Sequence, residues 1–382
     1  MRVGVVAGEA SGDLLGAGLI EAVRRRIPEA RFEGVAGARM VDAGCDALAD
    51  SEALAVMGLV EPLRELPKLL RLRRMLIDRW QNEPPDVFVG IDAPEFNLGL
   101  ELRLRRRGIR TIQYVSPQVW AWRQRRVKKI GRAVDKVLCL LPFEKAFYDA
   151  HGVPAEVVGH PLADHLPEDL DRSDERRALG IGDVPVVTLM PGSRRGEVQR
   201  LGPIFAKAAE MLAQRHSDIA FVAPMANANA RQTFSAQLAA ATPGLDVILL
   251  DGESTRAIVA ADVVLLASGT ASLQTALLER PMVSAYRVAA GTYWLAKALR
   301  LLKVPHFTMP NLLTDKPLVP EYLQYEATSE NLADAVGELL ADPDRRAGIE
   351  RHFANLRRSL GLGADERAAE AVIAMARGNR SA

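Results

Sequence analysis

The chain has few cysteines and no long hydrophobic run. Cys45 and Cys139 are the only cysteines among its 382 residues, and they form no CxxC pair. This argues against a disulfide framework and a thiolate zinc site, and it fits a reducing cytoplasm. No apolar run approaches the roughly 20 residues that span a bilayer, so we expect any membrane contact to be peripheral.

An excess of charge of one sign is also missing. Lys and Arg number 49 against 48 Asp and Glu, which leaves a net charge of +1. A nearly neutral chain has no global field to attract nucleic acid, so any basic surface must be a local patch. We therefore expect no nucleic-acid partner.

Common metal and dinucleotide motifs are absent as well. The six histidines show no HExxH spacing, and the first predicted turn reads GEASGD rather than GxGxxG, which argues against a nicotinamide dehydrogenase. The two DxD strings, at 169–171 and 342–344, do not follow strands. We expect no metal and no cofactor.

What is present is an alternation of short apolar runs with helical segments. Such alternation predicts parallel sheets, and the chain is long enough for two domains. The predicted strands are 3–7, 32–35, 87–91, 111–115, 137–141 and 157–158, then 186–190, 219–223, 247–250, 263–267 and 282–286.

A polar, proline-rich stretch separates the two series of strands. We place the domains at residues 1–166 and 167–340, with helices over 341–382 that return toward the first domain. The fold class is α/β, with two doubly wound domains that face each other across a cleft. Ligands are expected in that cleft, beyond the carboxyl ends of the strands.

The GEASGD segment follows the first predicted strand and precedes a predicted helix over 14–27. Its glycines allow a tight turn and close approach to a ligand, so the segment is a candidate acceptor site. Ser11 and Asp13 fit equally well as ordinary helix caps. The candidate residues are Gly8, Glu9, Ser11, Gly12 and Asp13.

Asp92 stands at the carboxyl end of another apolar run, in VGIDAPEFN, and Pro94 prevents simple continuation of the strand. A partly buried carboxylate that faces a sugar hydroxyl is suited to act as a general base. The alternative is a capping residue for the next helix.

Two segments of the second domain are suited to phosphate binding. PGSRRGEV and LLASGTASLQTAL each run from a strand into a helix, where hydroxyls, amides and an arginine can hold a diphosphate. Gln274 is placed to reach a ribose hydroxyl. The candidate residues are Ser193, Arg194, Ser268, Gly269, Thr270 and Gln274.

The segment 57–79 alternates large apolar and basic residues, which favours contact with a membrane surface or an acyl chain over a simple core helix. A second basic run carries two tryptophans, a mixture suited to the membrane interface. The residues expected to make this contact are Leu66, Leu69, Leu70, Leu72, Arg73, Arg74, Met75, Leu76, Trp120 and Trp122.

Taken together, these motifs resemble those of one enzyme family. GEASGD, VGIDAPEFN, YVSPQVWAWRQRRVKKI, LPFEKAFY, PGSRRGEV, LLASGTASLQTAL and PNLL occur in the order found in the lipid A disaccharide synthases of Gram-negative bacteria. The resemblance covers nearly the whole chain. It implies the GT-B glycosyltransferase fold, with the acceptor bound mainly by the first domain and the UDP-sugar by the second.

The resemblance also implies the reaction. The donor would be UDP-diacylglucosamine and the acceptor diacylglucosamine 1-phosphate, joined with inversion in a β-1,6 linkage at the cytoplasmic face of the inner membrane. Asp92 would deprotonate the acceptor 6-hydroxyl, and Arg194 with the SGT turn would stabilise the departing diphosphate without a metal. Asn311, within PNLL, and Glu321, which follows that segment, are further donor-site candidates, and a homodimer is expected.

One position departs from the family pattern, and two alternatives stay open. Related chains often carry a glutamate where this chain has Gln274. A second GT-B transferase that acts on a lipid-linked sugar, such as the peptidoglycan enzyme, would share the fold. A non-catalytic lipid- or nucleotide-binding protein would also share it, although Asp92 and Arg194 argue against that.

Overall fold

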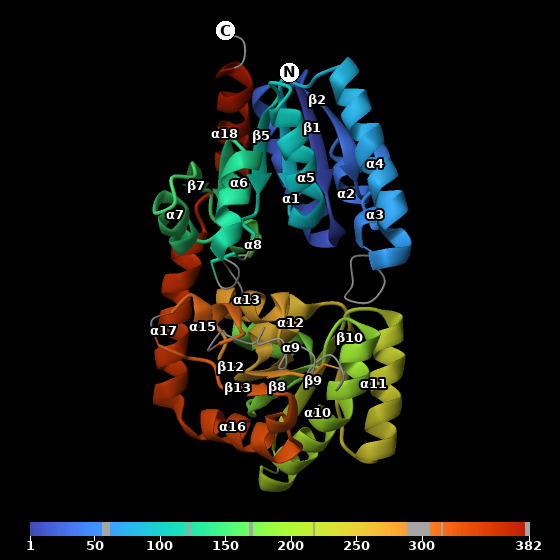
Figure 1. The fold of residues 1–382 in the computed structure, drawn as a ribbon. Helices are drawn as coiled ribbons and strands as arrows, with labels where there is room; N and C mark the ends of the chain where they lie inside the picture. Colours follow the sequence, from blue (N-terminus) through green and yellow to red (C-terminus); the bar gives the residue numbers. More distant parts are fainter. Residues whose placement is uncertain are drawn as a thin grey trace. The chain divides into compact units, whose positions relative to one another are not determined.

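The computed structural model describes residues 1–55, 62–117, 119–120, 124–167, 171–216, 218–288, 306–314 and 316–378. The chain forms two compact units (Figure 1). The first unit comprises residues 1–165 and 359–382, and the second comprises residues 166–358.

The first unit is built on one parallel sheet in the order β3-β2-β1-β4-β5-β6-β7. Its strands are β1 (Arg2–Ala7), β2 (Arg31–Ala36), β3 (Cys45–Asp50), β4 (Val87–Ile91), β5 (Arg110–Tyr114), β6 (Lys136–Cys139) and β7 (Ala155–Val157). The helices are α1 (Glu9–Arg26), α2 (Ala38–Asp42), α3 (Glu52–Ala55), α4 (Pro62–Asn82), α5 (Pro94–Arg105), α6 (Val127–Ala133), α7 (Pro142–Asp149) and α8 (Pro161–His165), with a 3₁₀ turn η1 (Gln124–Arg126).

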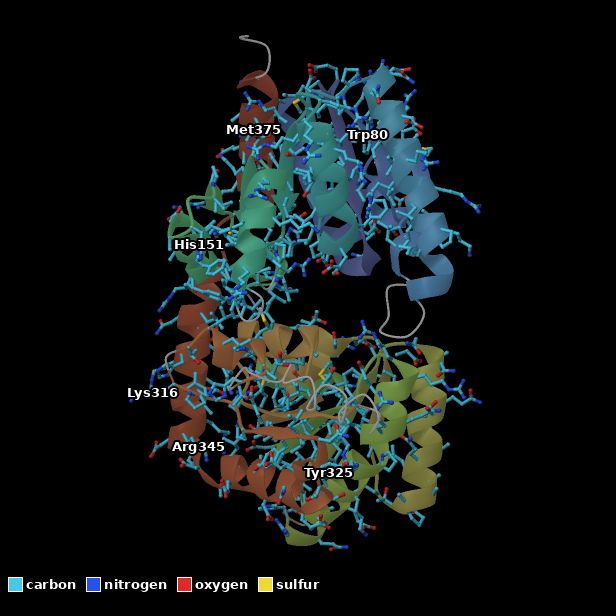
Figure 2. All side chains as sticks on the ribbon, viewed as in Figure 1. Trp80, His151, Lys316, Tyr325, Arg345 and Met375 are labelled. Carbon is cyan, nitrogen blue, oxygen red and sulfur yellow. The ribbon has the colours of Figure 1, made fainter. Side chains whose placement is uncertain are left out.

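Helices cover both faces of this sheet. α4, α5 and α6 form one layer in which neighbours pack side by side, and α1 packs with the C-terminal α18 (Ala364–Gly378) in the other (Figure 1). The central strands are buried on both sides, which explains their continuous apolar runs. Trp80, fully buried at the end of α4, packs on Phe88 with ring centroids 5.2 Å apart (Figure 2).

The second unit has a parallel sheet in the order β10-β9-β8-β11-β12-β13. Its strands are β8 (Val186–Met190), β9 (Ala220–Met225), β10 (Ile248–Asp251), β11 (Val263–Ala267), β12 (Met282–Tyr286) and β13 (Glu321–Leu323). The helices are α9 (Arg172–Ala178), α10 (Arg195–Arg215), α11 (Ala228–Ala241), α12 (Ser254–Ala260), α13 (Thr270–Leu277), α15 (Met309–Leu312), α16 (Ser329–Ala341) and α17 (Pro343–Leu360), with a 3₁₀ turn η2 (Gln324–Glu326).

These sheets confirm the predicted α/β class with two doubly wound domains. From Ser329 on, the described chain is helical and comprises α16, α17 and α18, with Pro343 at the start of α17. α18 packs on α1 in the first unit. α17 belongs to the second unit as far as Arg358, whereas the sequence-based boundary of the returning helices stood at residue 341.

Candidate active site

In the first unit, the candidate residues lie where the strand order reverses. β1 has β2 on one side and β4 on the other, and Ala7 stands opposite Ile91 at the carboxyl ends of β1 and β4. GEASGD and Asp92 therefore leave adjacent strands at the same edge of the sheet. In doubly wound sheets this switch point is the usual place for a ligand.

The backbone at Asp92 is strained. Asp92 and Ala93 have φ angles of 52° and 41°, in the left-handed region that non-glycine residues seldom adopt. Each such residue costs on the order of 1–3 kcal/mol and persists only where its surroundings enforce it. The strain ends β4 abruptly and leaves the half-buried Asp92 at the sheet edge.

Buried hydrogen bonds hold this conformation. The Asp92 N–H donates to the Tyr114 carbonyl over 2.9 Å, and the Asp92 carbonyl accepts from Asn97 Nδ2 at 2.8 Å and Gln113 Nε2 at 3.1 Å. Asn97 and Gln113 are fully buried. The sequence analysis did not select these two amides, although polar residues inside otherwise apolar elements were the available signal.

The GEASGD segment is helical rather than an extended loop. Because α1 begins at Glu9, only Gly8 lies between strand and helix, which corrects the predicted helix start at 14. A Cβ on Gly8 would lie 2.6 Å from the Ala93 Cβ, so only glycine fits between the two segments. Ser11 is exposed, Gly12 is buried, and the side chain of Glu9 lies outside the described residues.

Asp13 has a structural role. Its buried carboxylate accepts hydrogen bonds from the backbone N–H groups of Gly37, Arg39 and Met40 at 2.9, 3.0 and 3.1 Å. These groups form the N-terminus of α2, so Asp13 caps α2 instead of α1. Asp13 therefore links α1 to α2. We now expect this residue to position the two helices rather than to contact the acceptor.

In the second unit, the two phosphate-binding candidates also meet at a switch point. β8 lies between β9 and β11, and Met190 stands opposite Leu266 near the ends of β8 and β11. PGSRR and SGT therefore follow neighbouring strands, as the sequence analysis expected of residues that share one ligand.

The PGSRR turn is exposed and partly occupied by a carboxylate. Gly192 has a φ of 130°, and Ser193 and Arg194 are exposed. Glu197 Oε2 accepts from the N–H groups of Ser193 and Arg194 at 3.2 and 3.3 Å, and Glu197 Oε1 lies 3.8 Å from the Arg194 guanidinium. These amides already donate to one anionic group, the Glu197 carboxylate, which is the kind of contact that a bound phosphate would make.

The SGT turn leads into α13 from its buried strand. Gly269 and Thr270 are exposed, while the Ser268 hydroxyl donates to the Phe307 carbonyl over 3.4 Å. Gln274 Nε2 donates to the hydroxyl oxygens of Ser254 and Thr255 at 3.1 and 3.2 Å. Gln274 thus binds hydroxyls of α12, and its contact with a ribose stays a prediction.

The side chains of Asn311 and Glu321 form hydrogen bonds with other groups of the protein. Asn311 is buried, its Oδ1 accepts from the N–H groups of Leu318 and Val319, and its Nδ2 donates to the Val319 carbonyl. The Glu321 carboxylate accepts from the N–H groups of Phe307 and Thr308 and bonds His306 at 3.0 Å. These bonds fix the PNLL segment, so both residues position it.

A buried carboxyl that the sequence analysis missed lies in the first turn of α7, which follows β6. Glu144 Oε1 accepts from Trp120 Nε1 at 3.2 Å, and Oε2 accepts from the Leu141 N–H at 3.1 Å. Burial raises the pKa of Glu144 to about 7, against the opposing effect of these hydrogen bonds. The three-residue spacing from Leu141 to Glu144 resembles a capping box but lacks the usual Ser or Thr.

The expected membrane contacts divide into packed and exposed residues. Leu76 is buried in the core, and Leu69 and Leu72 pack against it. Arg73 stacks 4.8 Å above the Phe96 ring, whereas Arg74 is exposed. Among the described side chains of α4, the exposed large apolar residues are Leu66, Leu70 and Met75, at 46%, 49% and 41%.

The tryptophans give a different result. Trp120 meets Phe143 edge to face at 4.7 Å, and its N–H is bound to Glu144. Trp120 therefore anchors its own loop to α7, and its contact with a membrane stays a prediction. Trp122 lies outside the described residues.

Two kinds of feature are missing from the described residues. None of the helices in these ranges is both long enough and apolar enough to cross a bilayer. Within the same ranges, no three His, Cys, Asp or Glu side chains gather in a way that would hold a metal ion.

Comparison with solved structures places the fold. The glycotransferase of kitacinnamycin is similar at 17% identity with a TM-score of 0.65, and 98% of each chain is covered. A putative UDP-N-acetylglucosamine 2-epimerase from Listeria monocytogenes is similar at 13% identity with a TM-score of 0.62, over 100% of this chain and 96% of the other. The fold is that of GT-B glycosyltransferases, and because an epimerase shares it, the fold does not decide the reaction.

Comparison of sequences is more specific. The sequence model described as lipid-A-disaccharide synthetase matches residues 3–375. A lipid-A-disaccharide synthase of Alkalilimnicola ehrlichii is 52% identical over 384 residues and is covered, like this chain, over 100% of its length. The chain therefore belongs to the lipid-A-disaccharide synthetase family.

Proposed function

We propose that the protein transfers diacylglucosamine from UDP-2,3-diacylglucosamine to 2,3-diacylglucosamine 1-phosphate, with release of UDP. The product is the β-1,6-linked disaccharide 1-phosphate, formed with inversion. Family membership supports an enzyme of lipid A biosynthesis that uses a UDP-sugar. The observation that carries the residue assignment is the strained Asp92 at the switch point of the first unit.

In this proposal, Asp92 acts as the general base. Its carboxylate takes the proton of the acceptor 6-hydroxyl while that oxygen attacks the anomeric carbon of the donor. Attack from the face opposite UDP inverts the anomeric configuration. The rigid backbone around Asp92 supports this role, because a base must be held within hydrogen-bond reach of the proton that it removes.

The second unit binds the donor through its diphosphate. Arg194 and the amides of the PGSRR and SGT turns stabilise the negative charge that develops on UDP as the glycosidic bond breaks. Glu197 must give up its bonds to the Ser193 and Arg194 amides for a diphosphate to take them. The positive charge of Arg194 supports a reaction that proceeds without a metal.

The protein acts at the cytoplasmic face of the inner membrane in this proposal. Its substrates carry acyl chains, and the exposed Leu66, Leu70 and Met75 of α4 offer an apolar contact to lipid. A second copy of the chain is the other partner that this apolar face fits. The mass of the purified protein in detergent, measured for wild type and Leu70→Ser, distinguishes a homodimer contact from a lipid contact.

Product analysis tests the proposal. The purified protein is incubated with both lipid substrates in the presence of EDTA, and UDP release and the lipid product are followed by chromatography and mass spectrometry. We expect one UDP for each disaccharide, no UDP without acceptor, and a β-1,6 linkage by NMR. Product that forms only with a polyprenyl-linked acceptor, or no product after metal is restored, would contradict the proposed substrates.

A further inference from the structure

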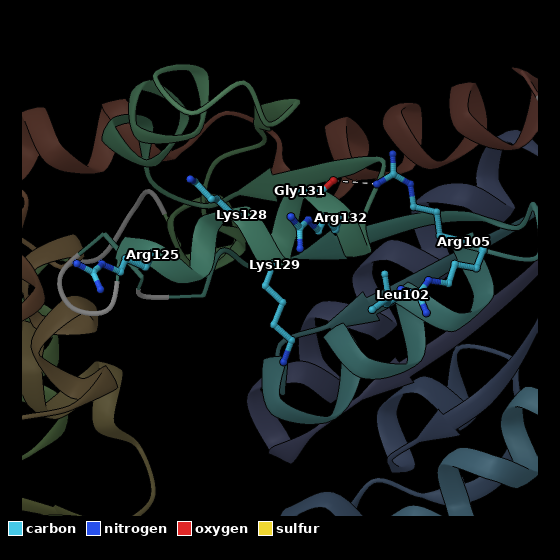
Figure 3. Close-up of a pocket in the computed structure, with 8 residues that line it drawn as sticks. Leu102, Arg105, Arg125, Lys128, Lys129, Gly131 and Arg132 are labelled. Atoms are coloured by element: carbon cyan, nitrogen blue, oxygen red, sulfur yellow. Dashed lines mark hydrogen bonds between the residues drawn. The ribbon is translucent and has the colours of Figure 1, made fainter.

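A strongly basic groove lies between α5 and α6 in the first unit, away from the switch point. It has a volume of about 720 Å³. Figure 3 shows its side chains projecting from the two helices. The lining residues are Leu102, Arg105, Arg106, Arg125, Lys128, Lys129, Gly131 and Arg132.

The positive charge of this groove is almost entirely uncompensated. Only Arg105 is neutralised, because it contacts Asp135 at 3.0 Å and donates to the Gly131 carbonyl. The other five basic residues are exposed, and across the described residues none of their side chains has an ion pair or hydrogen bond. A chain with a net charge of only +1 therefore concentrates five unpaired cations in one groove.

This arrangement is unfavourable for the isolated protein. Lys128 and Arg132 stand four positions apart on α6, so their side chains lie on the same face of the helix and their like charges repel. None of the described residues that line the groove is acidic, so no carboxylate among them relieves that repulsion. An anionic partner would relieve it, and several flexible cations favour a spread of phosphates over one ordered phosphate held by fixed, buried donors.

The position of the groove indicates which anion it meets. α4 packs beside α5, and α5 packs beside α6, so the exposed Leu66, Leu70 and Met75 belong to the same helical layer as the groove. Packed helices lie about 8–10 Å apart. One layer of the first unit thus presents apolar residues beside a basic groove, the combination that binds the surface of an anionic bilayer.

We propose that the α5–α6 groove binds the phosphate headgroups of anionic membrane lipids and, with the exposed residues of α4, docks the first unit on the bilayer. This inference rests on the proposed location at a membrane surface. Nucleic acid is the less favoured partner, because none of the described residues that line the groove is aromatic and able to stack on bases.

Vesicle binding tests the inference. Sedimentation with vesicles of equal parts phosphatidylglycerol and phosphatidylcholine is measured for wild type and for the triple variant Lys128→Gln, Lys129→Gln, Arg132→Gln. Each basic residue beside an anionic surface contributes roughly a five-fold factor, so binding should weaken on the order of 100-fold. Binding of wild type should also fall steeply as salt is raised, since exposed charges are screened.

The matched control removes the same charge elsewhere in the first unit. Arg31, Arg39 and Arg377 are exposed and have no ion pair within the ranges that the structure describes. The variant Arg31→Gln, Arg39→Gln, Arg377→Gln should bind vesicles like wild type. Equal loss in both triple variants would show an effect of net charge alone and overturn the assignment to the groove.

Three further outcomes separate the alternatives. Displacement from vesicles by inorganic phosphate at constant ionic strength would show a discrete phosphate site and contradict membrane docking. If the groove variant loses binding to duplex DNA but keeps vesicle binding, the partner is nucleic acid. If wild type binds vesicles and the groove variant binds equally well, only this inference fails.

Turnover in detergent micelles separates this inference from the proposed function. The groove variant should keep wild-type turnover there, because micelles deliver the lipid substrates without an anionic bilayer. Failure of wild type to make disaccharide in micelles would contradict the proposed substrates and leave the vesicle result unaffected.

Discussion

The switch points of the two units are built in opposite ways. In the first unit, two consecutive non-glycine residues, Asp92 and Ala93, are held at positive φ by fully buried amides. In the second, the PGSRR turn uses Gly192 and exposes Ser193 and Arg194. The same topology thus supports a rigid edge suited to a reacting group and an adaptable edge suited to binding phosphate.

Replacement of Asp92 should have the largest effect. Asp92→Asn keeps the shape but removes the base, so we expect kcat to fall about 1,000-fold, since general base catalysis contributes 10²–10⁴-fold. UDP affinity should stay within a factor of about two, because the proposed donor contacts lie in the other unit. Glu95→Gln, which removes an exposed carboxylate nearby, is the control. Equal loss of UDP binding and turnover in Asp92→Asn would make Asp92 structural.

The buried Glu144 makes the stability of the first unit depend on pH. Its folded pKa of about 7 exceeds the ordinary value of 4.5, so the folded state binds the proton more tightly than the unfolded state. The protonated Glu144 therefore contributes to the free energy of unfolding. This contribution is full below pH 4.5 and is lost as pH rises to about 7, and the loss amounts to about 3 kcal/mol. Urea unfolding across this window should show the decline in wild type and its absence in Glu144→Gln. Parallel curves for the two proteins would contradict the raised pKa.

Loss of the support beneath Asp92 should lower turnover without affecting binding. Gln113→Leu removes the donor to the Asp92 carbonyl, and misplacement of a catalytic group can reduce the rate up to about 100-fold. We expect kcat to fall about 30-fold while the donor KM is unchanged. Thr111→Val, buried in the same strand and bonded to Ala133 and Asp135 instead, serves as control. A change in KM alone would assign Gln113 to the binding site.

The exposed edge of the second unit should show the smallest effect. Arg194→Ala removes one exposed charge-assisted contact, so we expect UDP affinity to fall about ten-fold by calorimetry. Arg195→Ala, which changes the adjacent exposed arginine, should change it little. A larger loss of UDP affinity in Arg195→Ala than in Arg194→Ala would assign the phosphate contact to Arg195. Unchanged affinity in both variants would exclude the turn from UDP binding.

The sequence predicted the sheets better than the details of the sites. β4, β8, β11 and β12 have the predicted bounds, because strands buried on both faces are continuous apolar runs. β3 was missed because two aspartates interrupt the apolar residues of CDALAD, and only Cys45 of this edge strand is buried. β13 was missed because it is a three-residue edge strand.

The roles of several candidate side chains could not be predicted from the sequence. Asp13 caps a helix that is distant in sequence, and Glu321 and Asn311 bond backbone groups of other segments. Such partners depend on tertiary packing, which local spacing does not reveal. Asn97 and Gln113 were missed for the same reason, since their acceptor is the Asp92 carbonyl rather than a motif.

Hydrogen exchange with and without UDP tests the division between the two edges most directly. The account predicts that UDP slows exchange at the amides of residues 193–196 and 269–272 in the second unit and leaves residues 8–12 and 92–93 in the first unit unchanged. Slower exchange confined to residues 8–12 and 92–93 would place UDP on the first unit and contradict the assignment of catalysis and donor binding to separate units.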